Sequence, residues 1–273
     1  MRTENEFQKL AIGLALKSGE IMRQSFRLGM KKKWKKDVTP ITATDEKINQ
    51  LVLNVIQKKY PDHSIIAEEG NKIVKNSEYV WVCDPVDGTI PFSHGYPLFT
   101  FSIALLRNGK VILGLIYDPI NNRLARAISG RGSFLNNKRI SVSSEAKISK
   151  VSLIEVNCDC KLSSLRDILI KKTGCYASVI YSISYASLLV ACGEFLADIF
   201  EYRSPWDGAA TKIIVEEAGG KVTDLFGKEQ RYDQEINGFI ASNGIVHKEL
   251  IEIVGSILKN KTSQKRSWKT KQE

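Results

Sequence analysis

The sequence is poor in the residues that build zinc sites and disulfide frameworks. Its 273 residues include only three histidines and five cysteines. Three histidines are too few for a histidine-built zinc site. The cysteine count is odd and only Cys158 and Cys160 are close together, which argues against a disulfide framework. These scarcities predict a reducing, cytoplasmic setting with free thiols.

Long apolar runs are also missing. No run approaches the roughly 18 residues that a membrane span needs. The first 22 residues are charged and amphipathic, and they lack the pattern of a secretory signal. With 43% hydrophobic and 26% charged residues, the composition is that of an ordinary globular protein. The sequence therefore predicts a globular chain without a membrane partner.

Positive charge is concentrated in two segments. The net charge is +10, and residues 23–37 hold seven Lys or Arg against one acid, while residues 259–273 hold six against one. One interpretation is a solvated basic loop and a frayed tail. The other is a patch that attracts an anionic substrate or nucleic acid. Only Trp34 and Trp268 accompany the lysines, so nucleic acid is the less favoured partner because its bases would find no aromatic ladder.

Hydrophobic periodicity predicts mixed α and β structure. Helical spacing predicts helices over 4–28, 44–59, 161–172, 184–193, 206–218 and 246–258. Thr44 is the expected N-cap of the second helix. Apolar or alternating segments predict strands within 63–70, 78–85, 151–156, 176–182 and 196–202, and hairpins over 99–119, with a turn at Asn108-Gly109, and over 130–143. The apolar strands predict parallel sheet buried between helical layers.

Acidic side chains follow or interrupt these predicted elements at three places. Glu68 and Glu69 follow "SIIA", Asp84 and Asp87 lie in "DPVD", and Asp207 begins "WDGAA". Taken singly, these features are also typical of a solvated acid pair, a plain turn and a helix start.

Pro85 restricts Asp84 to extended geometry, so Asp84 and Asp87 can turn toward one centre with the carbonyl of Val86 between them. Converging carboxylates repel one another unless cations lie among them. Oxygen ligands favour Mg²⁺ or Mn²⁺. Gly88-Thr89 could open a helix whose amides face an anion. Metal carboxylates beside a phosphate cradle predict phosphoryl chemistry.

Five motifs in this order resemble the inositol monophosphatase family of Mg²⁺-dependent, lithium-sensitive phosphatases. They are "TATD" (42–45), "AEEG" (67–70), "DPVDGT" (84–89), "PWDGAA" (205–210) and "EEAGG" (216–220), with "GRGSFLNNKRISVS" (130–143) as a fitting hairpin. The resemblance covers residues 5–258. It implies an α+β (mixed α/β) fold, a five-layer αβαβα sandwich, and a homodimer. We expect one domain over 1–260, with subdomains over about 1–148 and 149–260, followed by a basic tail, 261–273.

The resemblance also assigns roles to individual residues. Asp45, Thr89 and Glu68 would be catalytic, with Asp45 and Thr89 orienting the attacking water. Glu68, Asp84 and the Val86 carbonyl would hold a first Mg²⁺, and Asp84, Asp87 and Asp207 a second. Glu69 would lie beside a third, weaker site, and Mn²⁺ could substitute. The implied substrate contacts are Asp87, Gly88, Thr89, Ser184, Glu201 and Asp207, the amides of Gly88 and Thr89 taking phosphate oxygens.

The leading functional prediction is a monoesterase for a small phosphorylated polyol or sugar, of the inositol-1-monophosphatase type. Histidinol-phosphate, fructose-1,6-bisphosphate and 3′-phosphoadenosine 5′-phosphate are alternative substrates. A dual-role protein that binds RNA or the transcription machinery through the basic segments is the alternative class. Pro91 and a loop at 201–207 that is one residue shorter depart from the family pattern. Lysines 31, 32, 33, 35 and 36 are expected at the rim of the site.

Overall fold

The computed structural model describes residues 4–36, 38–70, 73, 75–158 and 162–269, with only the backbone for 260–269. Cys160, Asp37 and the last part of the basic segment, 270–273, lie outside the described residues. The helices are α1 (Glu4–Ser25), α2 (Ala43–Lys59), α3 (Thr89–His94), α4 (Leu165–Thr173), α5 (Ile183–Ala191), α6 (Pro205–Glu217) and α7 (His247–Lys269). Among the described residues, none of these helices combines the length and the apolar character that crossing a bilayer requires.

The strands form two large sheets and one short ribbon. The ribbon pairs β1 (Lys33–Trp34) with β2 (Pro40–Ile41). The seven-stranded sheet consists, in spatial order, of β3 (Ser64–Ala67), β4 (Tyr79–Asp87), β5 (Thr100–Arg107), β6 (Lys110–Asp118), β7 (Arg123–Ile128), β8 (Ser133–Leu135) and β9 (Lys138–Arg139). The five-stranded sheet consists of β11 (Tyr176–Ser178), β10 (Leu153–Asn157), β12 (Ala197–Phe200), β14 (Phe239–Ser242) and β13 (Lys221–Thr223).

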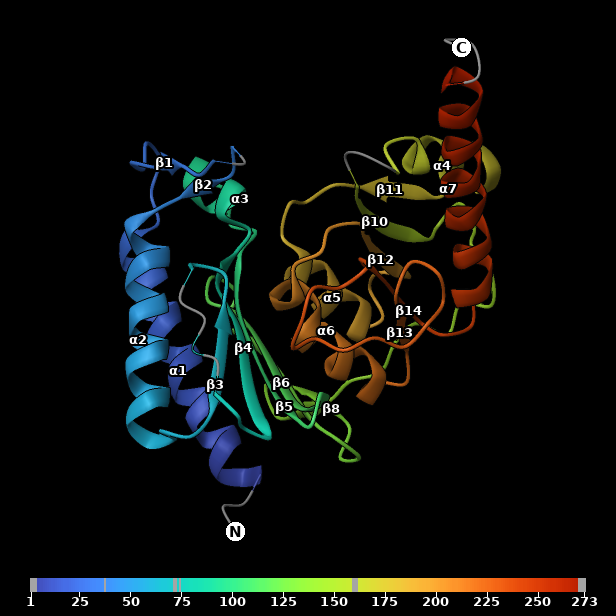
Figure 1. Cartoon of the computed structure of the whole chain (residues 1–273). Coiled ribbons are helices and arrows are strands. Elements are labelled where there is room, and N and C mark those ends of the chain that lie inside the picture. Colours follow the sequence, from blue (N-terminus) through green and yellow to red (C-terminus); the bar gives the residue numbers. More distant parts are fainter. Residues whose placement is uncertain (1–3, 37, 71–72, 74, 159–161, 270–273) are drawn as a thin grey trace.

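Five layers follow one another across the molecule (Figure 1). Helices α1 and α2 cover one face of the seven-stranded sheet, and α5 and α6 cover the other. The same α5 and α6 also cover the five-stranded sheet, whose far face packs against α4 and α7. Alternate residues of a strand enter different cores: Trp81 and Cys83 face α1 and α2, whereas Val82 faces α5 and α6. The predicted α+β fold and its αβαβα layering are confirmed.

The prediction of parallel strands is wrong for most pairs. In the seven-stranded sheet only β3 and β4 run parallel, and every later neighbour is antiparallel. In the five-stranded sheet β10 is parallel to β11 and β12, while β14 is antiparallel to both its neighbours. Helices cover both faces of the large sheet, so its antiparallel strands are as continuously apolar as parallel strands usually are.

Several helix boundaries differ from the sequence predictions. Helix α1 ends at Ser25 and not at residue 28, and α4 begins at Leu165 and not at residue 161. The N-cap of α2 is Thr42, not Thr44: the Thr42 hydroxyl accepts from the Thr44 amide at 3.2 Å, and Asp45 at position N3 completes a capping box. The last helix does not stop near residue 258, since its backbone stays helical to Lys269. The hairpin turn at Asn108-Gly109 is confirmed, with both residues at positive φ (50° and 78°).

One close approach holds α6 against the sheet. Gly114 on β6 faces α6, and a Cβ added there would lie 2.4 Å from Cγ2 of Ile213 and 3.1 Å from the carbonyl oxygen of Ala210. A side chain at this position would therefore push α6 away from the sheet.

We expect Gly114→Ala to lower the free energy of unfolding by about 1–3 kcal/mol, because the added methyl overpacks this contact. Gly13→Ala is the matched control, since Gly13 is exposed on α1 with no atom within 4 Å of an added Cβ. It should stabilise by up to about 1 kcal/mol through helix propensity. Denaturant unfolding measures both, and equal stability of the two variants would contradict the predicted overpacking.

Candidate active site

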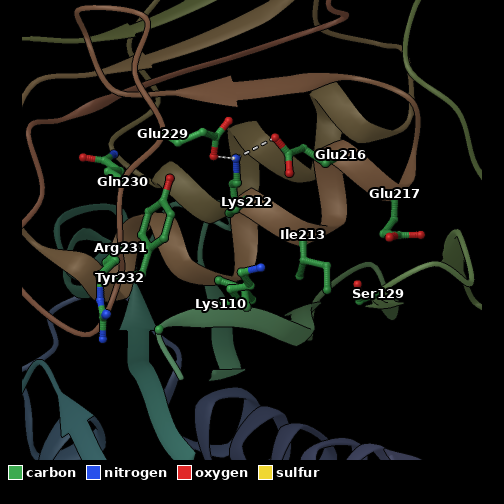
Figure 2. Close-up of a pocket in the computed structure, with 12 residues that line it drawn as sticks. Lys110, Ser129, Lys212, Ile213, Glu216, Glu217, Glu229, Gln230, Arg231 and Tyr232 are labelled. Carbon is green, nitrogen blue, oxygen red and sulfur yellow. Dashed lines mark hydrogen bonds and ion pairs between the residues drawn. The ribbon is translucent and has the colours of Figure 1, made fainter. Parts of the chain in front are cut away.

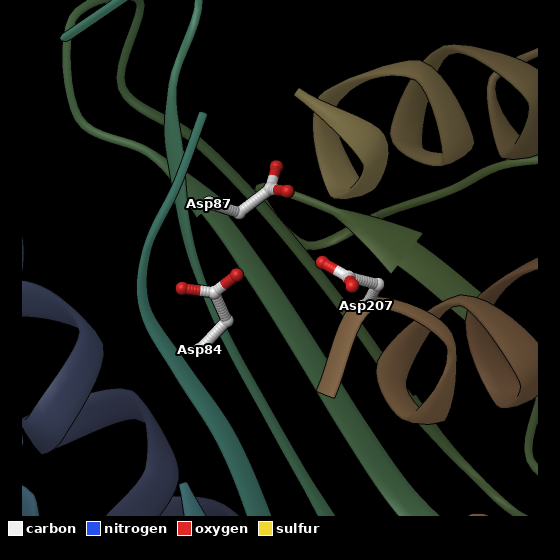
Figure 3. Close-up of side chains that lie close together, drawn as sticks. All are labelled: Asp84, Asp87 and Asp207. Carbon is white, nitrogen blue, oxygen red and sulfur yellow. The ribbon is translucent and has the colours of Figure 1, made fainter. Parts of the chain in front are cut away.

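A bulge in β4 brings Asp84 and Asp87 to the same side of the strand. Residues three apart on a regular strand point to opposite faces. The pairing with β5 shifts register between them, so that Asp84 lies opposite Ser102 and Asp87 opposite Thr100. This extra residue on β4 turns both carboxylates toward α6, whose first turn carries Asp207 (Figure 3). Ligand oxygens of Asp84, Asp87 and Asp207 all lie within 4.8 Å of one another.

Burial makes this cluster electrostatically costly. Asp84 and Asp87 are each 2% exposed. Burial raises the pKa of Asp84 well above its usual value, and the charges of Glu68, Asp87 and Asp207 raise it further. Burial and the charge of Asp87 likewise raise the pKa of Asp207 well above its usual value. Within the described part of the chain, no cationic side chain pairs with any of these three carboxylates. Their charge would therefore have to be offset by a bound cation.

Asp87 is held at the start of α5 as well as by its own strand. Its Oδ1 accepts from the amide of Ile183 at 3.0 Å, and its Oδ2 accepts from the amide of Ser184 at 3.0 Å. The hydroxyls of Ser182, at 2.5 Å, and Thr100, at 3.1 Å, also donate to Oδ2. Burial outweighs these hydrogen bonds and raises the pKa of Asp87 to about 6. Four donors thus fix the orientation of the Asp87 carboxylate.

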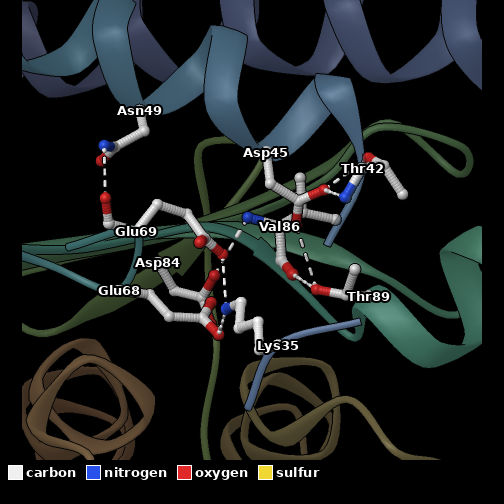
Figure 4. Close-up of polar contacts among 9 residues, drawn as sticks. All are labelled: Lys35, Thr42, Asp45, Asn49, Glu68, Glu69, Asp84, Val86 and Thr89. Carbon is white, nitrogen blue, oxygen red and sulfur yellow. Dashed lines mark hydrogen bonds and ion pairs between the residues drawn. The ribbon is translucent and has the colours of Figure 1, made fainter. Parts of the chain in front are cut away.

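A second set of polar groups lies beside the aspartates (Figure 4). Asp45 is fully buried, accepts from the Thr42 amide at 2.9 Å through Oδ2, and accepts from the Thr89 hydroxyl at 3.1 Å through Oδ1. The same Thr89 hydroxyl lies 3.0 Å from the carbonyl oxygen of Val86. Burial raises the pKa of Asp45 to about 6. The structure therefore joins three of the predicted site residues, Asp45, Val86 and Thr89.

Lys35 does not lie at the rim as expected. Its Nζ lies 2.8 Å from Oε1 of Glu68 and 2.7 Å from Oε1 of Glu69. Burial opposes the charge of Lys35, but the two carboxylates favour it more strongly, so the pKa of Lys35 is raised. Burial and the charge of Glu68 raise the pKa of Glu69 to about 7 despite this ion pair. The ribbon thus places one ammonium group against the two glutamates of "AEEG".

Gly88 joins the bulge to α3. Its φ is 85°, and a Cβ there would lie 2.8 Å from the carbonyl oxygen of Leu98 and 2.8 Å from Cβ of Ser182. Only glycine fits this left-handed, crowded position. Pro91 is buried within α3, which still forms, with the Phe92 amide donating to the Gly88 carbonyl at 2.9 Å. The departure at Pro91 therefore does not prevent the helix.

The remaining predicted substrate contacts lie in different environments. The Ser184 side chain is fully buried and its amide is bound to Asp87. The Glu201 carboxylate accepts from the amide of Leu162 at 2.8 Å. Arg203, in the short loop before α6, pairs with Glu235 at 2.8 Å on the surface.

A pocket of about 580 Å³ lies beside the C-terminal half of α6 (Figure 2), and none of the three clustered aspartates lines it. Lys212 on α6 contacts Glu216 at 2.7 Å, Glu229 at 2.6 Å and the carbonyl oxygen of Val222 at 3.0 Å. These contacts tie α6, the helix that carries Asp207, to β13 and to the loop after it.

Several residues of the site escaped sequence reasoning. Thr42 carries a local signal, since a threonine three residues before an acid is a capping-box pattern. Thr100 and Ser182 show no local sequence signal, because each contacts Asp87 only through tertiary packing.

The chain is similar to known phosphatases over nearly its whole length. The model of the inositol monophosphatase family matches residues 3–259. The fructose-1,6-bisphosphatase/inositol-1-monophosphatase of Thermotoga maritima is 34% identical over 80% of this chain and 83% of its own. A solved Thermotoga maritima inositol monophosphatase superposes with a TM-score of 0.84 at 31% identity, over 93% of this chain and 99% of its own. An inositol monophosphatase/NADP phosphatase solved with Mg²⁺ and phosphate has a TM-score of 0.82 at 25% identity, over 92% and 96%.

We expect added Mg²⁺ to raise the thermal midpoint more at about pH 8 than at about pH 5. The pKa of Asp45 rises from 3.8 to about 6 on folding, and that of Glu69 from 4.5 to about 7. A buried acid with a raised pKa destabilises the metal-free fold increasingly as the pH rises from the unfolded to the folded value, here from about 4 to 7. At about pH 8 these acids are ionised and repel the neighbouring carboxylates. A bound divalent cation offsets this repulsion, so it stabilises the fold more at that pH.

Thermal unfolding after EDTA treatment, with and without Mg²⁺, measures this difference. Asp84→Asn is the control, and it should reduce the Mg²⁺ effect at both pH values. Equal gains in the thermal midpoint at the two pH values would contradict the predicted titration.

Proposed function

The chain belongs to the inositol monophosphatase family of phosphatases, as its motifs predicted, and we propose that Asp84, Asp87 and Asp207 carry its activity. The observation behind this proposal is the convergence of these three carboxylates within 4.8 Å at the β4 bulge. The leading substrate is an inositol monophosphate. Histidinol-phosphate, fructose-1,6-bisphosphate and 3′-phosphoadenosine 5′-phosphate are alternative substrates, because the aspartate cluster would interact with the phosphate group and not with the alcohol that leaves.

The donor set fits Mg²⁺. All donors are oxygens, and two of the three aspartates are nearly inaccessible to solvent. No described cationic side chain pairs with the three aspartates, whereas Glu68 and Glu69 pair with Lys35. We propose that Glu68, Asp84 and the Val86 carbonyl hold one ion, and that Asp84, Asp87 and Asp207 hold a second. Glu69 would contact a third ion, and Mn²⁺ could substitute. Bound Mg²⁺ would supply an activated water and neutralise the charge that develops on the leaving oxygen.

The proton chemistry is assigned to Asp45 and Thr89. The Thr89 hydroxyl donates to Asp45 at 3.1 Å, which leaves its oxygen able to accept a hydrogen bond from an attacking water. Asp45, with a pKa of about 6, is mainly ionised at neutral pH and can take up a proton relayed through Thr89. The capping contact with Thr42 fixes the Asp45 carboxylate while this happens.

Phosphate and alcohol recognition are assigned to the surrounding loops. We propose that the amides of Gly88 and Thr89, at the start of α3, bind phosphate oxygens. Ser184 would act indirectly, through the hydrogen bond from its amide to Asp87, because its side chain is buried. A substrate hydroxyl at Glu201 would share that carboxylate with the amide of Leu162. Lithium sensitivity and a homodimeric state complete the proposal and rest on the family resemblance. A cytoplasmic location rests on the cysteine content.

We expect Asp87→Asn to lower kcat for a phosphate monoester by roughly 10³-fold, because it removes a preorganised charge at the reacting centre. Asp207→Asn should do the same. The wild-type activity should vanish in EDTA and return with Mg²⁺. Asp62→Asn, at an exposed position, is the control and should leave kcat unchanged. Near-normal kcat in the Asp87→Asn enzyme would refute the assignment, and undiminished activity in EDTA would refute metal dependence.

The basic residues before α2 are proposed to steer anionic substrates. Lys31 and Lys33 are exposed, and Lys32 is half-buried, with its Nζ 2.8 Å from Nε2 of His94 on α3. The ribbon that carries Lys33 also carries the chain to Lys35, which touches the site. Charges so placed act over about a Debye length on an approaching anion.

We expect the triple change of Lys31, Lys32 and Lys33 to Gln to raise KM at low salt, more for a bisphosphate than for a monophosphate, with little change in kcat. The difference should fade at high salt. The matched control changes three exposed lysines on the far side, Lys147, Lys150 and Lys171, to Gln. An unchanged KM at low salt would show that the segment is solvated surface without a role in attracting the substrate. Specific RNA binding that weakens steeply with salt would favour the alternative, dual-role class.

A further inference from the structure

Two acidic side chains outside the active site are buried next to each other. Glu155 on β10 and Asp198 on β12 are direct partners in neighbouring parallel strands, and neither is accessible to solvent. Their sequence neighbours Ile154 and Ile199 face α4 and α7. Because side chains alternate along a strand, Glu155 and Asp198 both face the central layer that contains α5 and α6.

No cationic side chain among the described residues pairs with either acid. Glu155 accepts from the Ser178 hydroxyl and from the Ile180 amide, each at 2.7 Å. Among the described residues, Asp198 is bound only through Oδ2, at 2.6 Å from the Ser187 hydroxyl, and its Oδ1 has no hydrogen-bond partner. Two buried charges this close, one of them with an unsatisfied oxygen, are strongly unfavourable.

The hydrogen bonds indicate which carboxyl group is neutral. Glu155 has a donor on each oxygen, which suits a carboxylate. Asp198 has a single donor, and its electrostatic surroundings include both Glu155 and Asp87. Burial raises the pKa of Asp198 well above its usual value, and these two acids raise it further. The proton therefore belongs on Asp198.

Asp198 is linked to Asp87 through α5. Ser187, its hydrogen-bond partner, lies one turn beyond Ile183 and Ser184, whose amides hold the Asp87 carboxylate. The five-stranded sheet thus anchors α5 through Ser187, and the first turn of α5 orients Asp87. A displaced α5 would misdirect a carboxylate that we place at the metal site.

We propose that Glu155 and Asp198 together carry a single negative charge, and that Asp198, as a neutral carboxylic acid, positions α5 through Ser187 and thereby orients Asp87. This inference rests on the proposed function only where it takes Asp87 to be a metal ligand. Asp198 is a positioning residue. It fixes the helix without adding a second full charge behind an already crowded set of carboxylates.

The test compares two replacements of Asp198 in the full-length protein. Asp198→Asn keeps the size and the acceptor for Ser187 but cannot ionise. It should match the wild type within about threefold in the Mg²⁺ midpoint for thermal stabilisation and in kcat, between about pH 6 and 9. Asp198→Ala removes the contact with Ser187 and should raise the Mg²⁺ midpoint by roughly tenfold or more, as other residues that support metal ligands do.

Ser187→Ala and Ser178→Ala form a matched pair. Each removes one hydroxyl bound to a carboxyl group of the pair, but only Ser187 lies on α5. Ser187→Ala should raise the Mg²⁺ midpoint several-fold, whereas Ser178→Ala should lower the thermal midpoint and leave the Mg²⁺ midpoint unchanged. Should Asp198→Ala fail to fold, this pair still decides the matter.

Two results would overturn the inference. If Asp198→Asn weakens Mg²⁺ binding as much as Asp198→Ala, the charge of Asp198 is required, and the proposal that Asp198 is a neutral acid is wrong. If Ser187→Ala changes only the thermal midpoint, the positioning role is wrong. Mg²⁺ binding, followed by thermal unfolding, needs no turnover. A wild type that binds Mg²⁺ but hydrolyses no phosphate ester would therefore refute the proposed function and leave this test intact.

Discussion

The repulsion among buried carboxylates is the constraint around which this molecule is organised. Asp84, Asp87 and Asp207 come from two different elements and meet at a place where Asp84 and Asp87 are nearly inaccessible to solvent. Folding alone gives no reason to gather like charges, since Asp87 and Asp207 raise the pKa of Asp84, and Asp87 raises the pKa of Asp207. Such a cluster is tolerable only if the surrounding structure holds each carboxylate rigidly and leaves the charge to be balanced by a bound cation.

The central helical layer provides that rigidity. Helix α6 carries Asp207 and packs on the seven-stranded sheet at Gly114, and α5 receives Asp87 at its first turn. Both helices also cover the five-stranded sheet, so the second half of the chain braces a site whose strand residues belong to the first half. The proposed role of Asp198 extends this bracing by one hydrogen bond, from β12 to α5.

Lys35 gives the site a cation of its own chain. Its ammonium group binds Glu68 and Glu69, which lie beside the aspartates but are more accessible than Asp84 and Asp87. The other lysines before α2 stay outside the cluster, where they can act on an approaching anion over a longer range. One basic segment therefore contributes Lys35 to the site and keeps the other lysines outside it, depending on which side chain the ribbon directs inward.

The local elements and most of the carboxylates of the site could be predicted from the sequence. Apolar periodicity marks the helices, Asn108-Gly109 marks a hairpin, and the ordered motifs mark the family, because each signal depends on residues close together in the chain. Tertiary structure alone decided the strand directions, the inward turn of Lys35 and the contacts of Thr100 and Ser182 with Asp87. These depend on how distant segments pack, and no short stretch of sequence records that packing.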